Sequence, residues 1–131
     1  MLRLTPAFAA LAAVFWVASL ASAQTAFVEG HVFNIRTGAP LPGATVRVFE
    51  NITFGPLPIE LAAGTTDENG FYQFEIDDFL GAPAIIDVVC ATRQGEIRGK
   101  SFARLRDGLI RRDVYLKTKR RLTRCEAVEF E

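Results

Sequence analysis

The stretch Gly30-His-Val-Phe-Asn-Ile-Arg-Thr-Gly-Ala-Pro-Leu-Pro-Gly-Ala-Thr-Val-Arg-Val-Phe49, answered by Gly64-Thr-Thr-Asp-Glu-Asn-Gly-Phe-Tyr-Gln-Phe74, decides the fold of this chain. Short apolar runs alternate in it with glycine, proline, asparagine and aspartate, which favour turns. The pattern predicts a strand, a glycine-proline loop, a second strand, and a tight Asp-Glu-Asn-Gly turn into another strand. We call the following residues of this stretch the fold motif: Gly30, Gly38, Pro42, Gly43, Ala44, Asp67, Asn69 and Gly70.

The rest of the chain continues this alternation and contains no convincing helical pattern. Seven runs with period-two hydrophobicity are bounded by turn residues, and several such runs predict a sandwich or a barrel. We therefore expect an all-β, antiparallel sandwich of seven to eight strands with prealbumin-like or immunoglobulin-like topology. The expected strands are residues 26–34, 44–50, 59–66, 71–77, 84–92, 96–104 and 109–117.

The alternation also predicts which side chains face the core. The run 84–92 is apolar on both faces and is expected inside a sheet. The Asp107-Gly108 pair predicts a hairpin between the last two strands. Arg112 interrupts the inward set of the last strand, so the register there is left open. The expected inward residues are Val28, Gly30, Val32, Ala44, Val46, Val48, Tyr72, Phe74, Ile76, Ile86, Val88, Cys90, Ile110, Val114 and Leu116.

The first 23 residues have the pattern of a secretory signal peptide. A basic Arg3 precedes an apolar run, and Ala21-Ser22-Ala23 supplies the small residues of a cleavage site. The alternative is a membrane anchor, but the run is shorter than the roughly 20 apolar residues that a span needs. We expect cleavage after Ala23, a single domain over 24–131, no transmembrane segment in that domain, and a secreted or periplasmic location.

Charge argues against a nucleic-acid partner. The chain has 15 basic and 15 acidic residues. Removal of Arg3 with the leader leaves a net charge of −1, whereas phosphate binding requires a clear basic excess.

The two cysteines, Cys90 and Cys125, predict a disulfide, because an exported chain meets an oxidising compartment. A metal site is less favoured, since two thiols and the single distant His31 form no recognisable ligand set. We expect no metal and no cofactor. The tail 118–131 is a candidate edge strand around Cys125–Phe130, held by the disulfide.

Two groups of residues are candidates for binding. Several phenylalanines alternate out of phase with the core and would form an apolar interaction patch, or a second packing layer if loops cover them. The tail carries a basic cluster suited to an anionic surface, although a charge run is more often simply solvated. The candidates are Phe27, Phe33, Phe49 and Phe71 in the first group, and Lys117, Lys119, Arg120, Arg121 and Arg124 in the second.

Other polar features have simpler explanations. His31 is expected on the solvent face of the first strand rather than as a general base, because no nucleophile lies near it in sequence. Turn chemistry accounts for Asp67, Glu68 and Asn69 without calcium. Asn51-Ile52-Thr53 is a glycosylation acceptor only if the source has that pathway.

The fold motif, together with Val46, Val48, Thr66, Tyr72 and Phe74, resembles the carboxypeptidase regulatory-like domain family. The resemblance covers roughly Ala26–Ile76, with a looser match to about Leu116. It implies a seven-stranded prealbumin-like sandwich and a non-catalytic role, as a module that binds another protein or a cell-envelope component.

Carbohydrate or anionic-surface binding is the alternative non-enzymatic function. Sugar platforms favour Trp and Tyr, whereas the only tryptophan, Trp16, lies in the leader. The enzymatic alternative is a transthyretin-like hydrolase. Such hydrolases need several histidines and a Tyr-Arg-Gly-Ser tail, whereas this chain has one histidine and ends Val128-Glu-Phe-Glu131. We therefore expect no enzymatic activity.

Overall fold

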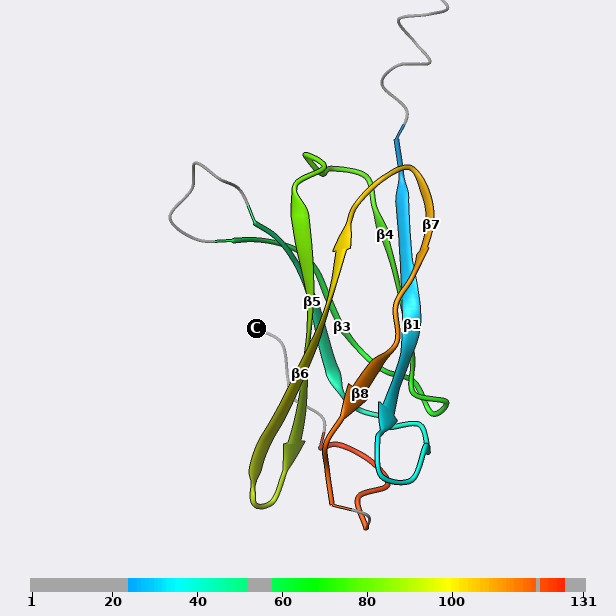
Figure 1. The fold of residues 1–131 in the computed structure, drawn as a ribbon, viewed down its shortest axis with the longest axis vertical. Coiled ribbons are helices and arrows are strands. Elements are labelled where there is room, and N and C mark those ends of the chain that lie inside the picture. The colour runs from blue at the N-terminus through cyan, green and yellow to red at the C-terminus, as the bar shows by residue number, and fades with distance from the viewer. Residues whose placement is uncertain (1–23, 52–57, 120, 127–131) are drawn as a thin grey trace, which may run out of the picture.

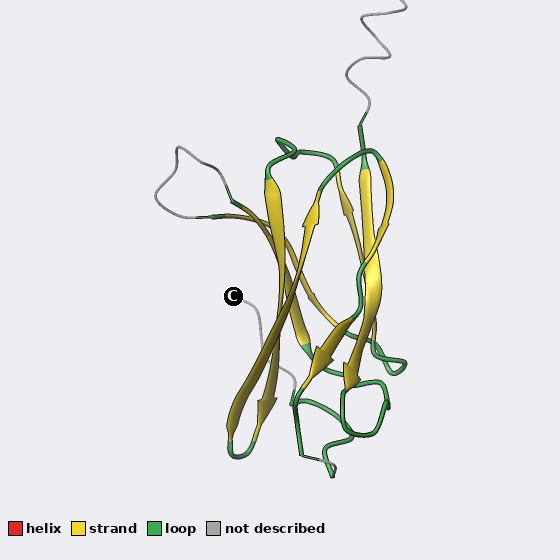
Figure 2. Cartoon of the chain, in the orientation of Figure 1, coloured by secondary structure: helices red, strands yellow, loops and turns green. Residues whose placement is uncertain are grey.

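The computed structural model describes residues 24–51, 58–119 and 121–126, so the expected leader 1–23 lies outside the described residues. The described residues form eight strands and no helix (Figures 1 and 2). None of them belongs to a helix that is long and apolar enough to cross a membrane. The strands are β1 (Ala26–Asn34), β2 (Thr45–Glu50), β3 (Ile59–Thr65), β4 (Phe71–Ile76), β5 (Pro83–Thr92), β6 (Gly95–Arg104), β7 (Gly108–Arg111) and β8 (Val114–Leu116).

The strands form two four-stranded sheets, which confirms the predicted all-β sandwich of seven to eight strands. Sheet I has the order β4-β1-β7, and β8 pairs with the end of β1, after the part of β1 that pairs with β7. Sheet II has the order β3-β2-β5-β6, with every pair antiparallel, and β5 lies inside the sheet as predicted. In sheet I, β1 pairs antiparallel with β4 but parallel with β7 and β8.

The predicted hairpin at Asp107-Gly108 is wrong, because β6 pairs with β5 and β7 pairs with β1. The turn joins the two sheets instead. The carboxylate of Asp107 accepts a hydrogen bond from the backbone N–H of Thr25, and the N–H of Gly108 donates to the Thr25 carbonyl. The Asp-Gly turn is therefore bonded to the residue before β1, and β7 continues alongside β1.

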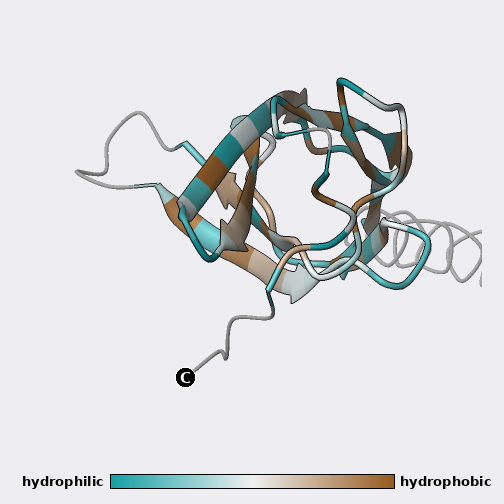
Figure 3. Cartoon of the chain, turned by 90° about the horizontal axis from the view of Figure 1, so that it is seen from below, coloured by the Kyte–Doolittle hydropathy of each residue, from teal (hydrophilic) through white to brown (hydrophobic). Residues whose placement is uncertain are grey.

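The core lies between the two sheets. Hydrophobic and hydrophilic residues alternate along the strands that enclose it (Figure 3). Of the expected inward residues, Phe74 is only partly buried, and the others have little or no exposed surface. Burial of this apolar set is the main favourable term in folding. The core also contains Ala26, Leu41, Ala84, Leu105 and Cys125.

The last predicted strand is divided where Arg112 interrupts its inward pattern. Arg112 N donates to the Glu29 carbonyl, and the Tyr72 hydroxyl donates to the Arg112 carbonyl. A Cβ atom at Gly30 would overlap that same carbonyl oxygen. Gly30 therefore allows β1 to approach the break between β7 and β8, which is the close backbone approach expected of a glycine inside a strand.

The disulfide between Cys90 and Cys125 is present and confirms the prediction. It fixes the tail to β5, and Cys125 N also donates to the Pro42 carbonyl at 2.8 Å. The described part of the tail forms one isolated bridge, Ala91 with Glu126, and no strand. The remainder of the expected edge strand, 127–131, lies outside the described residues.

Candidate functional site

The outer face of sheet I carries four stacked or tilted rings, which we call the aromatic row: Phe71, His31, Phe33 and Tyr115. Alternation places them outward, and strand pairing aligns His31 with Phe71 and Phe33 with Tyr115. Ring centroids are 5.2 Å apart for His31 and Phe71, 5.5 Å for His31 and Phe33, and 5.4 Å for Phe33 and Tyr115. These separations are typical of favourable aromatic pairs.

The aromatic row is partly exposed, and further apolar side chains extend the same face. Tyr115 exposes 56% of its surface and Ile35, just beyond β1, exposes 58%. Nearer the start of β1, Phe27 lies opposite Leu109 of β7, and both are exposed. Glu29, Gln73 and Arg111 lie between this pair and the aromatic row, so the outer face of sheet I carries two separate apolar groups.

Three of the four predicted phenylalanines therefore share the outer face of sheet I. Phe27, Phe33 and Phe71 lie on it, whereas Phe49 lies on β2 of the other sheet. Phe49 lines a shallow depression with Pro58 and Ile85. The predicted phenylalanine set is thus divided between the two outer faces.

His31 and Asp113 add a polar element to the aromatic row. Asp113 Oδ1 accepts a hydrogen bond from the His31 backbone N–H at 2.9 Å, and it lies 3.9 Å from His31 Nδ1. Both side chains are about one-third exposed. The histidine lies on the outer face of β1, as its position in the alternation predicts. Within the described ranges, no three His, Cys, Asp or Glu side chains form a possible metal site.

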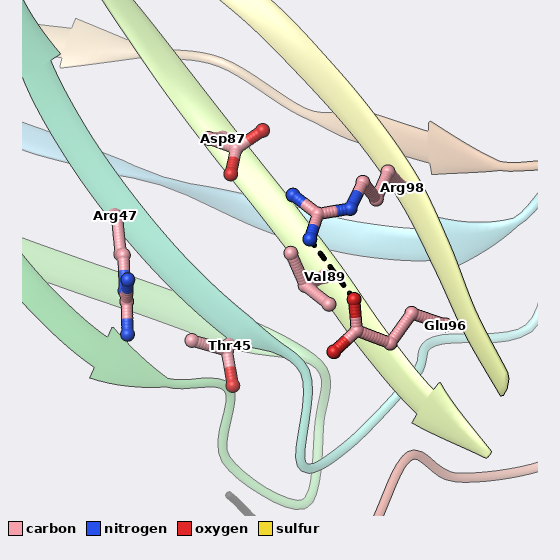
Figure 4. A pocket seen from close by; sticks show the side chains of 6 residues that line it. All are labelled: Thr45, Arg47, Asp87, Val89, Glu96 and Arg98. Atoms are coloured by element: carbon pink, nitrogen blue, oxygen red, sulfur yellow. Dashed lines mark hydrogen bonds and ion pairs between the residues drawn. The ribbon is translucent and has the colours of Figure 1, made fainter. Parts of the chain in front are cut away.

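The outer face of sheet II carries a small charged hollow of about 130 Å³ (Figure 4). Arg98 bonds to Glu96 at 2.9 Å, and Arg47 lies 3.5 Å from Glu60 beside the hollow. The Thr45 hydroxyl is buried and has no hydrogen-bond partner among the described residues. Because Arg98 pairs with Glu96 within β6 and Arg47 pairs with Glu60 on the neighbouring strand, we regard the hollow as part of a solvated charged face.

The predicted basic cluster is placed only in part, since Arg120 lies outside the described residues. Lys117, Lys119 and Arg121 are exposed. Arg124 instead reaches the fold-motif turn, where it bonds to Glu68 at 2.7 Å. The cluster is therefore not a single patch.

The fold motif is fully engaged in backbone geometry. Asp67 Oδ1 accepts hydrogen bonds from Asn69 N at 2.8 Å and from Phe71 N at 3.0 Å, which is turn chemistry. Gly43 has a φ of 78°, and a Cβ there would meet the Cys125 carbonyl. Gly38 and Gly70 also have positive φ, whereas Pro42 accepts from Cys125 and Ala44 is buried in the core.

Some residues of this face were not predicted from the sequence. Tyr115 and Leu109 alternate with the inward Ile110, Val114 and Leu116, so period-two alternation alone could have placed them outward. Two buried polar residues, Asn34 and Glu50, end β1 and β2, and each bonds to loop backbone. Burial of polar groups cannot be predicted from alternation alone.

Of the predicted glycosylation acceptor, only the exposed Asn51 lies among the described residues.

No family model matches the chain, and no curated protein matches it. A solved structure of a 9R-lipoxygenase from Cyanothece PCC8801 is similar with a TM-score of 0.46 and 17% identity, over 72% of this chain and 16% of that one. A crystal structure of (S)-allantoin synthase is similar with a TM-score of 0.54 and 12% identity, over 73% of this chain and 42% of that one.

The chain therefore corresponds to less than half the length of either protein. At such low identity, a structural likeness supports the fold alone. Neither similarity identifies a family.

Proposed function

We propose that this chain is an exported, non-catalytic sandwich module of the carboxypeptidase regulatory-like kind. In this proposal it binds another protein or a cell-envelope component through the outer face of sheet I. The aromatic row is the observation that supports it, because it places partly exposed rings side by side on one flat face. Aromatic residues are enriched where proteins bind one another.

The stacking favours a protein partner over a sugar. The Phe33 ring stacks with both His31 and Tyr115, with interplanar angles of 16° and 29°. Ring faces are thus used within the row, whereas a sugar platform requires an open ring face. A partner side chain packs against ring edges without this requirement.

Export is supported by the leader pattern and by the disulfide, since such bonds persist in oxidising compartments. We therefore propose a secreted or periplasmic location. The non-catalytic part of the proposal is supported by His31, whose ring packs between phenylalanines and whose nearest carboxylate already accepts a backbone hydrogen bond.

The test compares one face with the other. We expect the protein to capture a partner from an extracellular or envelope extract, and Phe33→Ser with Tyr115→Ser to lose it. Phe102→Ser is the matched control, because Phe102 is 63% exposed on the outer face of sheet II. The captured partner is then purified and its binding measured directly.

Equal binding by wild type and the Phe33→Ser/Tyr115→Ser variant would rule out the aromatic row as the binding surface. Retention on a glycan array instead would support the carbohydrate alternative. Turnover of any substrate that His31→Ala abolishes would contradict the non-catalytic proposal.

A further inference from the structure

Charge is strongly segregated along this neutral chain. From Val48 to Thr92 there are eight acidic residues and no lysine or arginine. From Arg93 to Arg124 there are twelve basic residues and three acidic ones. Asymmetry of this size between parts of a chain indicates an interaction role.

The fold turns this separation into two opposite sides of the sandwich. β3 and β4 are edge strands of different sheets that contact each other on one side, where a Cβ at Gly64 would touch the Phe74 ring. β6 contacts β8 on the other side, where a Cβ at Gly99 would overlap Leu116. The first side belongs to the acidic stretch and the second to the basic stretch.

The charges on both sides are exposed. We define the acidic side as Glu60, Asp67, Glu68, Glu75, Asp77 and Asp78, and the basic side as Arg98, Lys100, Arg104, Arg106, Arg111, Lys117, Lys119 and Arg121.

Few of these charges are paired within the molecule. Glu60 pairs with Arg47, Glu68 with Arg124, and Arg98 with Glu96. Among the described residues, the other members of both sides form no ion pair.

Charges of opposite sign also lie at the same end of the sandwich. Thr25 Oγ1 donates to Asp77, and Thr25 N donates to Asp107, the neighbour of Arg106. The end of β4 and the corner after β6 therefore both lie beside Thr25. Arg104 donates to the Gly81 carbonyl of its own copy and keeps further N–H donors. A second copy displaced sideways without rotation would bring Arg106 and these remaining donors of Arg104 against the carboxylates at the end of β4.

We propose that copies of this chain associate head to tail, with the acidic side of one copy against the basic side of the next. Such a contact is heterologous, because it joins two different surfaces of the same molecule. Complementary potentials favour this register, and the near-zero net charge removes long-range repulsion between copies. A polyanion as the partner would bind only the basic side, whereas a second copy of this chain accounts for both sides.

The acidic and basic sides contain none of the four rings of the aromatic row, so Phe33→Ser/Tyr115→Ser should leave the association unchanged, and the two proposals can fail separately. Charge-neutralising substitutions test the association. The variant Glu75→Gln/Asp78→Asn weakens the acidic side, and Arg104→Gln/Arg106→Gln weakens the basic side. Arg36→Gln is the control, because Arg36 is exposed in the loop after β1, outside both sides.

Sedimentation velocity measures the outcome. We expect the wild-type mass to rise with concentration at low salt and to return to monomer near 1 M salt, where exposed charges are screened within about 3 Å. Each double variant should raise the dissociation constant about tenfold, whereas the control should not. An equimolar mixture of the two double variants should stop at the 1:1 dimer, because each retains one intact side.

A wild-type protein that stays monomeric at low salt would overturn the proposal, as would association that the double variants leave unchanged. Heparin and vesicles containing anionic lipid test whether the basic side instead binds a polyanion. If the monomeric protein binds either probe and Arg104→Gln/Arg106→Gln abolishes that binding, the basic side is a polyanion site and the head-to-tail proposal is wrong.

Discussion

Sheets I and II bury similar inward faces but are built in different ways. In sheet II, β5 and β6 pair in one unbroken register from Pro83–Arg104 to Thr92–Gly95, and the one irregularity lies at Val48/Phe49. In sheet I, β1 changes partner from β7 to β8 at the break beside Gly30. Sheet II thus follows from alternation and hairpins, whereas sheet I depends on a particular tertiary contact.

The outer faces of the two sheets also differ in their side chains. Sheet II presents ion pairs such as Arg98 with Glu96, which contribute little to stability at an exposed site. Sheet I presents the aromatic row, whose alignment needs β8 to lie in register beside β1. The proposed binding face therefore lies on the sheet with the less regular construction.

Substitution of Gly30 should break sheet I most severely. Gly30→Ala places a methyl group on the Arg112 carbonyl, and neither backbone can move without loss of strand pairing. We expect the free energy of unfolding to fall by about 4 kcal/mol or more. Urea denaturation followed by circular dichroism measures it.

Gly99→Ala in β6 is the matched control for sheet II. Its methyl group would meet the side chains of Leu116 and Val114, which can shift. We expect a loss of about 1–2 kcal/mol, typical of modest overpacking. Equal losses for the two variants would show that the backbone contact at Gly30 has no special importance.

The regular features of the fold could be predicted from the sequence. Alternation correctly places Val28, Val46 and Ile86 inward. The Asp67-Glu-Asn-Gly70 turn leads into β4, as expected. The partner of β7 was not predictable in this way. An Asp-Gly pair predicts a turn but does not indicate which strand the following segment pairs with. Here the Asp107 carboxylate accepts a hydrogen bond from Thr25 N, and β7 pairs with β1.

The candidate site could be predicted less completely. Alternation identifies Phe33 and Phe71 as outward, but not that Phe49 lies on the other sheet, because sheet order depends on long-range pairing. The segregation of charge is visible in the sequence. Its meaning depends on β3 lying beside β4 and β6 beside β8, which only the fold reveals.

Removal of the disulfide should be the next largest effect. Cys90 and Cys125 are 35 residues apart, and in the chain-entropy model closing such a loop stabilises by about 3–4 kcal/mol. We expect Cys90→Ser with Cys125→Ser to lose that amount in urea denaturation. Reduced wild type is the control, and it should lose a similar amount; a loss below about 1 kcal/mol in both would contradict the chain-entropy estimate. Other bonds also hold the tail.

Those other bonds are centred on Asn34, which ends β1 as Glu50 ends β2. The Asn34 amide donates to the carbonyls of Lys119 and Leu122, whereas Glu50 accepts from the N–H groups of Leu80 and Ala82. We expect Asn34→Ala to lose about 2 kcal/mol, because the buried amide and its bond to the Leu122 carbonyl are lost. The Lys119 carbonyl still accepts from Thr118 Oγ1 and Leu122 N. Hydrogen exchange should rise in the tail.

Glu50→Gln is the counterpart in sheet II. Glutamine keeps one acceptor oxygen, so we expect a loss of about 1–2 kcal/mol and faster exchange only at the Leu80 and Ala82 amides. Faster exchange in the same segment for both variants would contradict the separate roles of the two residues.

Tyr72→Phe should have the smallest effect, and it probes sheet I through pH. The hydroxyl donates to the Arg112 carbonyl, so its removal should cost about 1 kcal/mol at pH 7. Burial, with a smaller contribution from the Asp113 charge, raises the pKa of Tyr72 above its ordinary value. The folded state therefore holds this proton more tightly than the unfolded state does.

Because the folded pKa is raised, the contribution of this group is fully present below about pH 10, the ordinary tyrosine value, and is lost as the pH rises above it. Wild type should lose up to about 1.4 kcal/mol per pH unit from this one group, and Tyr72→Phe should lack that slope. Urea denaturation between pH 8 and 11 measures the difference, with Tyr115→Phe as the control on the exposed aromatic row. Parallel curves for wild type and Tyr72→Phe would show that the hydroxyl is not held in the sheet I break, because a buried phenol that ionises on unfolding cannot leave the pH dependence unchanged.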